Sequence, residues 1–243
     1  MGFTLPSVPR PGQRDGMATP PPIRLVVLDL AGTTVRDDGA VEAAFIEALH
    51  QADVGPGTDG YEQRLAYLRT TMGSSKIEVF RELLGDESAA QRANTAFEAA
   101  YGAGLAGGGA EPIPGAVDAI AALRAAGVLV CLTTGFSSAT RDALLDALGW
   151  RNIADLALSP GPGVRGRPHP DLVLAAVLAL GVDDVRHVAV AGDTANDLLA
   201  GTRAGASVVA GVLTGAHDRS TLAAAPHTHL LESVADLPPL CVA

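Results

Sequence analysis

Two aspartates of this chain each follow a short apolar run and precede a turn. Asp29 ends the run Leu25–Leu28, and Asp193 comes after the run Val188–Ala191 and one glycine. Apolar runs of this length, bounded by turn residues, are typical of buried parallel strands. Open α/β sheets bind their ligands at the carboxyl ends of such strands. We therefore expect both carboxylates at the ligand-binding edge of one sheet.

A third carboxylate, Asp197, lies four residues after Asp193 and shares its face if the turn is already helical. Three carboxylates at strand ends are suited to Mg²⁺, which prefers oxygen ligands. Each aspartate also has a common structural explanation, since Asp29 could cap a turn and Asp193 could be a helix N-cap. The triplet Thr133-Thr134-Gly135, which closes another apolar strand, favours a site built from several strand ends.

The turn after Asp29 has the small residues of an anion-binding loop. Gly32 and Thr33 follow the strand closely, and we expect their backbone N–H groups to be free to bind an anion. A cation is predicted from Gly166-Arg167-Pro168, a rigid loop before a helix, in which Arg167 could hold a phosphoryl oxygen. Arg165 is the alternative for this role. The stretch 161–166 matches the glycine pattern of dinucleotide-binding loops, but the prolines that follow exclude it because no helix can start there.

Lys76 is the only lysine of the chain, beside 16 arginines. Where positive charge alone is needed, this sequence uses arginine. A retained lysine can lose its proton and act as a nucleophilic amine, which a guanidinium cannot do. Chance survival on a helix surface is the ordinary alternative, and the composition alone favours it.

The composition indicates a globular protein. The chain has 243 residues, of which 48% are hydrophobic, and no apolar run reaches the ~18–20 residues of a membrane span. A net charge of −10 argues against a nucleic-acid partner and makes a metal plausible beside a bound anion. Cys131 and Cys241 give no disulfide framework, so we expect a cytoplasmic location. We expect residues 1–22, rich in proline and glycine, to be a flexible tail.

Hydrophobic spacing divides the rest of the chain into two parts. Between 40 and 112 it predicts only helices, at 41–50, 61–71, 77–84 and 88–101, followed by a glycine-rich connector at 102–114. From 115 onward, helices alternate with apolar strands, which predicts a parallel sheet covered on both faces. We therefore expect an α/β fold with a doubly wound, Rossmann-like core at 23–39 and 113–243. An all-helical cap at 40–112 would be inserted where it can cover Asp29. Strands are predicted at 128–133, 187–191, 207–210 and near 229–231, and helices at 115–126, 138–148, 171–180 and 196–204.

These motifs together resemble the haloacid dehalogenase superfamily, and within it the phosphonoacetaldehyde hydrolases (phosphonatases). The first motif reads Asp-x-Ala-Gly-Thr-Thr from Asp29, and the cap contains Met-Gly-x-x-Lys-Ile from Met72. Thr133-Thr134-Gly135, Gly166-Arg167-Pro168 and Gly192-Asp193-Thr194 also match. The resemblance spans roughly 23–215 and implies a hydrolase.

The resemblance also implies roles for individual residues. Asp29 would attack phosphorus, Thr134 and Arg167 would hold the phosphoryl oxygens, and Lys76 would form a Schiff base with the substrate. Mg²⁺ would be held by Asp29, the Ala31 carbonyl and Asp193, with Asp197 supporting the metal site. Water would then hydrolyse the aspartyl phosphate. The implied substrate-binding residues are Gly32, Thr33, Met72, Gly73, Gly135 and Phe136.

The chemistry at positions 31 and 76 points to one reaction. Most phosphatases of this superfamily have a second aspartate where this chain has Ala31, and that aspartate protonates a departing alkoxide. A carbon leaving group needs an electron sink instead, which Lys76 can supply as an iminium. We therefore expect cleavage of a carbon–phosphorus bond in a small phosphonate.

Three differences from the phosphonatase pattern leave the substrate open. Val79 replaces a histidine, Phe136 replaces a tyrosine, and the stretch 37–40 lacks a cysteine. The first alternative is a phosphomonoester hydrolase in which Lys76 only binds an anion. A second is a catalytically silent phosphate-binding protein. A homodimer is also left open.

Overall fold

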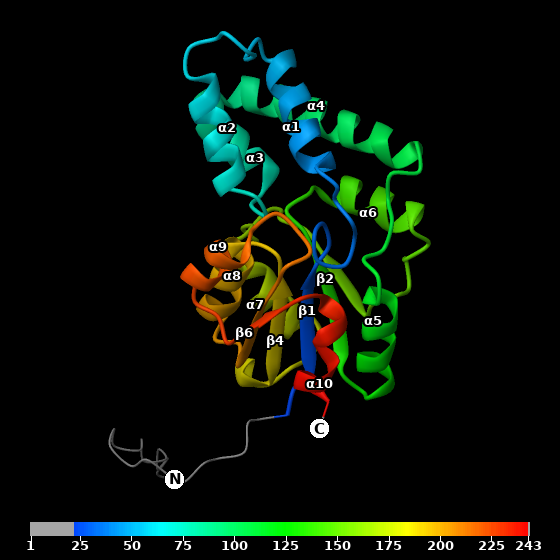
Figure 1. Cartoon of the computed structure of the whole chain (residues 1–243). Helices are drawn as coiled ribbons and strands as arrows, with labels where there is room; N and C mark the ends of the chain where they lie inside the picture. Colours follow the sequence, from blue (N-terminus) through cyan, green and yellow to red (C-terminus); the bar gives the residue numbers. More distant parts are fainter. Residues whose placement is uncertain (1–21, 243) are drawn as a thin grey trace, which may run out of the picture.

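The computed structural model describes residues 22–242, with a parallel sheet below a layer of helices (Figure 1). The flexible tail predicted at 1–22 lies, apart from Pro22, outside the described residues. Within 22–242, each helix is too short or too polar to span a membrane.

The sheet has six parallel strands in the order β3-β2-β1-β4-β5-β6. Because β2 and β4 flank β1, the direction of winding reverses at β1, and such switch points are where α/β sheets bind ligands. The predicted doubly wound, Rossmann-like core is confirmed. The strands are β1 (Leu25–Asp29), β2 (Leu129–Thr133), β3 (Leu156–Leu158), β4 (Val188–Gly192), β5 (Val208–Val212) and β6 (His229–Leu231).

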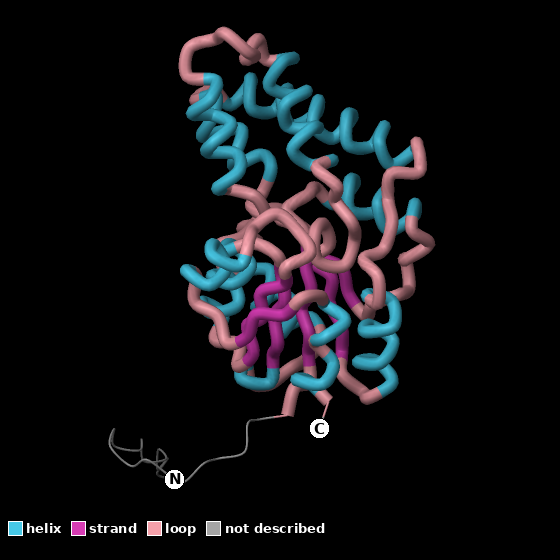
Figure 2. The backbone as a smooth tube through the Cα atoms, viewed as in Figure 1, coloured by secondary structure: helices cyan, strands magenta, loops and turns pink. Residues whose placement is uncertain are grey.

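Helices cover both faces of the sheet (Figure 2). Side chains alternate along a strand, so Val26 and Leu28 of β1 join one apolar cluster while Leu25 and Val27 join another. The first cluster includes α5 (Ala116–Ala125), α6 (Ser138–Ala147) and α10 (Pro238–Cys241). The second includes α7 (Asp171–Ala179). The end of α8 (Ala195–Ala204) joins the second cluster, and a third, smaller cluster joins α8 and α9 (Arg219–Ala224) to β5.

Four helices without an intervening strand connect β1 to α5 and lie above the carboxyl edge of the sheet (Figure 1). Phe45, Phe80 and Phe97 from three of these helices form an aromatic cluster, with ring centroids 4.8–6.3 Å apart. This helical layer consists of α1 (Ala40–Gln51), α2 (Tyr61–Thr70), α3 (Lys76–Leu84) and α4 (Glu87–Ala106).

Several boundaries differ from the predictions. α4 ends at Ala106 instead of 101. Tyr101 and Leu105, one helix turn apart, are both buried, and this burial offsets the weak helix propensity of the glycines. His187, predicted in a strand, belongs to a short 3₁₀ helix whose N-cap is Asp184. β3, α9 and α10, which have three to six residues each, were not predicted, although the equally short β6 was.

Candidate active site

Asp29 and Asp193 lie at the same edge of the sheet because they end neighbouring parallel strands, β1 and β4. On the other side of β1, Asp29 pairs with Thr133 of β2, and Thr134 follows it. The side chains of Asp29, Asp193 and Thr134 are all buried. The strand register therefore brings the three predicted strand ends to one place.

The expectation of free backbone N–H groups at Gly32 and Thr33 is wrong. The Gly32 N–H donates to the Val35 carbonyl at 2.7 Å, and the Thr33 N–H donates to the Leu30 carbonyl at 3.3 Å. The tight turn thus satisfies its own donors. Both residues instead support Asp193, since Thr33 Oγ1 donates to its Oδ1 at 3.1 Å. A Cβ on Gly32 would lie 2.3 Å from Asp193 Oδ2, so only glycine allows this approach.

Two other backbone N–H groups are available at this edge. Those of Ala31 and Gly135 have no hydrogen-bond acceptor among residues 22–242, and both residues line the cavity that contains Asp29. Thr134 Oγ1 accepts a hydrogen bond from the Phe136 N–H at 3.2 Å, which leaves its own proton for a ligand. These donors are suited to bind an anion.

Arg167 lies between two carboxylates. Its Nη1 contacts both Asp29 and Asp197, and the side chain is buried. Its Nε has no partner among the described residues. A buried donor without a partner costs free energy unless a ligand accepts its hydrogen bond. The alternative cation, Arg165, is exposed and pairs with Asp171 at 2.8 Å. Arg167, and not Arg165, therefore faces Asp29.

The three predicted carboxylates do not form one metal-binding group. Between residues 22 and 242, no three His, Cys, Asp or Glu side chains come close enough to hold a metal ion. Asp197 caps α8, accepting hydrogen bonds from the Thr194 N–H and hydroxyl, and it contacts Arg167. The oxygens of Asp197 are therefore already shared, which argues against it as a ligand. The candidate ligands that remain are Asp29, Asp193 and the Ala31 carbonyl.

The two remaining carboxylates lack a full counter-charge. Burial raises the pKa of Asp29 to about 7, although the charge of Arg167 opposes this rise. Burial also raises the pKa of Asp193 well above its usual range, and the charges of Asp29 and Asp197 add to the rise. Ionising both Asp29 and Asp193 in this buried place is costly without a further cation. The carbonyl and two carboxylates thus fit a hard divalent cation such as Mg²⁺.

Lys76 is the first residue of α3 and is buried. Its Nζ lies 5.3 Å from the ring centroids of Phe45 and Phe136 and 6.0 Å from that of Phe97. Burial and the charge of Arg167 lower the pKa of Lys76 to about 8, while nearby carboxylates oppose the change. At pH 7 about a tenth of Lys76 is therefore the free amine, far more than for an exposed lysine.

The segment that leads into α3 packs directly on loops of the sheet layer. A Cβ on Gly73 would lie 2.6 Å from Thr194 Oγ1, and a Cβ on Gly135 would lie 2.3 Å from the Ser74 carbonyl oxygen. Glycine at positions 73 and 135 thus permits a contact between the layers that a side chain would prevent. This contact places Lys76 opposite the strand ends.

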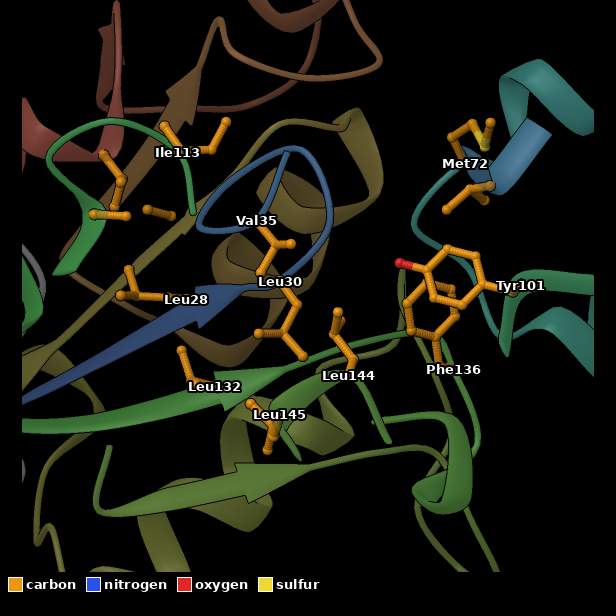
Figure 3. Packing of buried hydrophobic residues seen from close by; sticks show 14 of the residues in the cluster. Leu28, Leu30, Val35, Met72, Tyr101, Ile113, Leu132, Phe136, Leu144 and Leu145 are labelled. Carbon is orange, nitrogen blue, oxygen red and sulfur yellow. The ribbon is translucent and has the colours of Figure 1, made fainter. Parts of the chain in front are cut away.

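Aromatic side chains close one side of this region. Figure 3 shows Tyr101 of α4 against Phe136, with ring centroids 4.6 Å apart. The hydroxyl oxygen of Tyr101 is on the side of Leu30 and Val35, at the end of β1 (Figure 3). Burial raises the pKa of Tyr101, and the charges of Asp37 and Asp29 raise it further, so the hydroxyl stays protonated.

Most of the predicted site residues share one small cavity of about 30 Å³. Gly32, Thr33 and Asp197 are predicted site residues that do not line it. A cleft of about 820 Å³ between the two layers shares Lys76 and Arg167 with this cavity. The predicted residues that line the small cavity are Asp29, Ala31, Met72, Gly73, Lys76, Thr134, Gly135, Phe136, Arg167 and Asp193.

Sequence reasoning missed three residues near this cavity. Asp37 lines it, Tyr101 packs on Phe136, and Asn196 donates from its side chain to the helical layer. Asp37 follows the first motif in an ordinary polar turn, and Tyr101 lies on a helix with no motif around it. Neither position therefore indicates a site in the sequence. Only Asn196, between two predicted carboxylates, carried a signal from its position.

A doubly wound sheet with buried aspartates at two adjacent strand ends is typical of Rossmann-like proteins that bind a ligand at the switch point. The sequence profile of the haloacid dehalogenase-like hydrolases matches residues 23–205. This chain belongs to that family of hydrolases.

Its relatives within the family have different names. The chain is 31% identical to phosphonoacetaldehyde hydrolase of Pseudomonas fluorescens, over 90% of its own length and 91% of the relative. It is 30% identical to the probable phosphatase IndB of Dickeya dadantii, over 88% of its own length and 91% of the relative. A phosphonoacetaldehyde hydrolase-like protein from Oleispira antarctica superposes with a TM-score of 0.78 at 24% identity, covering 95% of each chain. The implied family is thus correct, and the relatives include both a phosphonatase and a phosphatase.

Proposed function

We propose that this hydrolase cleaves the carbon–phosphorus bond of a small aldehyde phosphonate, phosphonoacetaldehyde or an analogue. The proposal rests on the place of Lys76, which is buried in the same cavity as Asp29 and has a pKa lowered to about 8. A free amine can attack an aldehyde, whereas a group that only binds an anion gains from remaining charged. Lys76 therefore fits amine chemistry better than simple charge attraction.

Lys76 would prepare the carbon side of the bond. Its Nζ adds to the aldehyde carbon, and loss of water leaves an iminium ion two atoms from phosphorus. The iminium accepts the electron pair of the breaking carbon–phosphorus bond and becomes an enamine. Protonation of that enamine and hydrolysis release the dephosphonated aldehyde and the free amine.

Asp29 would attack from the phosphorus side. Its carboxylate oxygen bonds to phosphorus as the carbon departs, which gives an aspartyl phosphate that water then hydrolyses. Arg167 and the hydroxyl of Thr134, both lining the cavity, would hold the phosphoryl oxygens. Ala31 supplies no acid, and a leaving group that departs as an enamine carbon needs none at that position.

Mg²⁺ is the proposed cofactor. Asp29, Asp193 and the Ala31 carbonyl would hold it, and when bound it supplies positive charge to the phosphoryl oxygens. Such a small set of protein ligands is usual for Mg²⁺, which keeps several waters and binds substrate phosphate. Asp193 is fixed for this role by hydrogen bonds from Thr33 and from the Ala216 N–H at 2.7 Å.

The segment 40–112 would act as a cap. Lys76 belongs to it and Asp29 belongs to the sheet layer, so the site is complete only when the two layers meet. Closure would exclude water from the iminium and bring the amine to the substrate. The partner of the protein would then be a small phosphonate or phosphate.

A phosphomonoester hydrolase is the second candidate. The relative named a probable phosphatase and the 820 Å³ cleft beside Lys76 both support it, since the cleft has room for a larger leaving group. In that case Lys76 would only bind the substrate as a cation. Ala31 argues against this function, because an alkoxide leaving group lacks its acid.

Phosphate release and covalent trapping together test the proposal. The enzyme would be incubated with Mg²⁺ and phosphonoacetaldehyde, then with borohydride, and digested for mass spectrometry. We expect phosphate release and one reduced adduct on Lys76, the only side-chain amine of its type in the chain. Phosphate release from esters alone, with Lys76 unmodified, would replace the proposal with the phosphomonoesterase function.

A further inference from the structure

Asp37 is a half-buried carboxylate in the same cavity as Lys76 and Asp29. It lies on the short connection between the first motif and α1. Its Oδ1 accepts a hydrogen bond from the Val41 N–H at 3.1 Å. Its Oδ2 has no hydrogen-bond donor from a side chain among residues 22–242. The backbone of Val41 and Gly39 thus holds the carboxylate in place, and no described side chain competes for its second oxygen.

The proposed reaction leaves one proton transfer without a group to carry it out. Forming an iminium from a buried amine requires a proton to be delivered to the departing oxygen. The cavity is lined by five ionisable side chains, and Asp29, Asp193, Arg167 and Lys76 already have roles. The rings around Lys76 cannot transfer protons. Asp37 is the ionisable group that remains.

We propose that Asp37 is the proton carrier for the amine chemistry of Lys76, an inference that rests on the proposed function. It names a catalytic group on the connection to α1, in the cavity that also contains Asp29 and Lys76. The same carboxylate would act in both directions, since imine hydrolysis reverses the steps of imine formation.

The proton balance of this step closes within the pair of Lys76 and Asp37. The pair begins as a neutral amine and a carboxylic acid, which together hold the same protons as the ammonium and carboxylate. The amine lone pair forms the carbon–nitrogen bond, and the nitrogen passes one proton to the carbonyl oxygen. The carboxylic acid then protonates the resulting hydroxyl, which leaves as water while nitrogen forms the double bond. The products are an iminium ion and the Asp37 carboxylate, an ion pair.

The surroundings lower the cost of reaching the neutral starting pair. Burial raises the pKa of Asp37, against the opposing effect of Lys76, and burial lowers the pKa of Lys76. Both shifts oppose charge separation between Lys76 and Asp37.

The variant Asp37→Asn tests this role with little risk to the fold, because the asparagine oxygen can still accept from the Val41 N–H. Asp38→Asn is the matched control, since Asp38 is the exposed neighbour. Each full-length protein would be mixed with phosphonoacetaldehyde and quenched with borohydride at increasing times, and the Lys76 adduct measured by mass spectrometry. We expect adduct formation to slow by about 100-fold or more in Asp37→Asn, as for loss of an acid–base group. We expect no change in Asp38→Asn, partial recovery in Asp37→Glu, and recovery of Asp37→Gly with added formate.

A purely electrostatic role gives the opposite sign. The Asp37 charge raises the pKa of Lys76, so removing that charge would increase the free amine and speed adduct formation at pH 7. An equal or faster rate in Asp37→Asn would therefore overturn the inference while leaving the proposed function intact. Absence of the adduct in the unaltered protein would overturn the proposed function and this inference with it.

Discussion

The side-chain amide of Asn196 donates a hydrogen bond to the Met72 carbonyl oxygen at 2.9 Å, across the boundary between the sheet and the helical layer. The same nitrogen contacts Ser74 Oγ at 3.1 Å. Asn196 stands between Asp193 and Asp197, in the first turn of α8. The loop that would hold the metal is thus tied to the turn that presents Lys76.

Replacing Asn196 by alanine should reduce kcat while the protein still folds. Two hydrogen bonds of about 0.5–1.5 kcal/mol each correspond to a loss of about 5- to 150-fold. Steady-state phosphate release and a thermal melt would separate the two effects. Asn152→Ala, at an exposed turn, is the control for loss of an amide. An unchanged kcat in Asn196→Ala would show that these contacts do not position Lys76.

Exchanging Lys76 for arginine should remove activity although it keeps the charge. A guanidinium stays protonated and is a poor nucleophile, so turnover of phosphonoacetaldehyde should fall on the order of 10³-fold or more. Phosphate release is the measurement. Retention of most activity in Lys76→Arg would indicate that Lys76 only attracts the substrate.

Removing the metal should stop turnover without unfolding the protein. Excess chelator would leave Asp29 and Asp193 without their proposed counter-charge, and added Mg²⁺ should restore activity. Asp29→Asn should lose activity on the order of 10⁴-fold or more, and Mg²⁺ should not rescue it. Phosphate release measures both effects. Full turnover in chelator would exclude Mg²⁺ from the mechanism.

Asp29→Asn should nevertheless stabilise the metal-free protein at neutral pH. Burial raises the pKa of Asp29 from 3.8 to about 7, so the folded state holds a proton that the unfolded state has lost between these values. The contribution of Asp29 to stability is therefore present below pH 3.8 and is lost as the pH rises through 7. Denaturant unfolding at pH 4 and at pH 8, in chelator, should show the variant gaining on the order of 1–4 kcal/mol relative to the unaltered protein. A constant difference between the two proteins across this range would contradict the raised pKa.

Gly135→Ala should separate the two layers. The added Cβ would lie 2.3 Å from the Ser74 carbonyl oxygen, so the turn before Lys76 must move. A displacement of about 1 Å at a reacting group can cost 100-fold in rate, and we expect a loss of at least this size. Gly161→Ala is the matched control, because a Cβ there meets nothing within 4 Å. Phosphate release from both variants, with melting curves, gives the comparison.

The strands of the sheet could be predicted where their own residues form a recognisable pattern. The apolar runs of β1 and β4 end in aspartate and glycine, and these local features identify buried strands and their ligand-binding edge. β3 has three half-buried residues at the side of β2 and is a strand only because β2 offers it a partner. No pattern in three residues could reveal that pairing.

The sequence indicated which residues form the site better than it indicated which hydrogen bonds they make. The motif around Asp29 selected the right turn, but whether the N–H groups of Gly32 and Thr33 are free depends on how the turn closes on Val35 and Leu30. Asp197 was predicted as a carboxylate near the metal, and its capping of α8 appears only with the helix start in place. The position of Asp37 in the cavity depends on contacts between layers, which local sequence does not encode.

Because Lys76 is only 6% exposed, the rate at which a reagent labels its amine can report how often the two layers separate. An acylating reagent can modify one side-chain amine here, and because that amine is almost fully covered, separation of the two layers should speed its modification. At low reagent concentration the labelling rate reports the open fraction, and at saturating reagent it reports the opening rate itself. Ligands that hold the layers together would lower the labelling rate, so the affinity of any small phosphonate or phosphate could be measured without turnover.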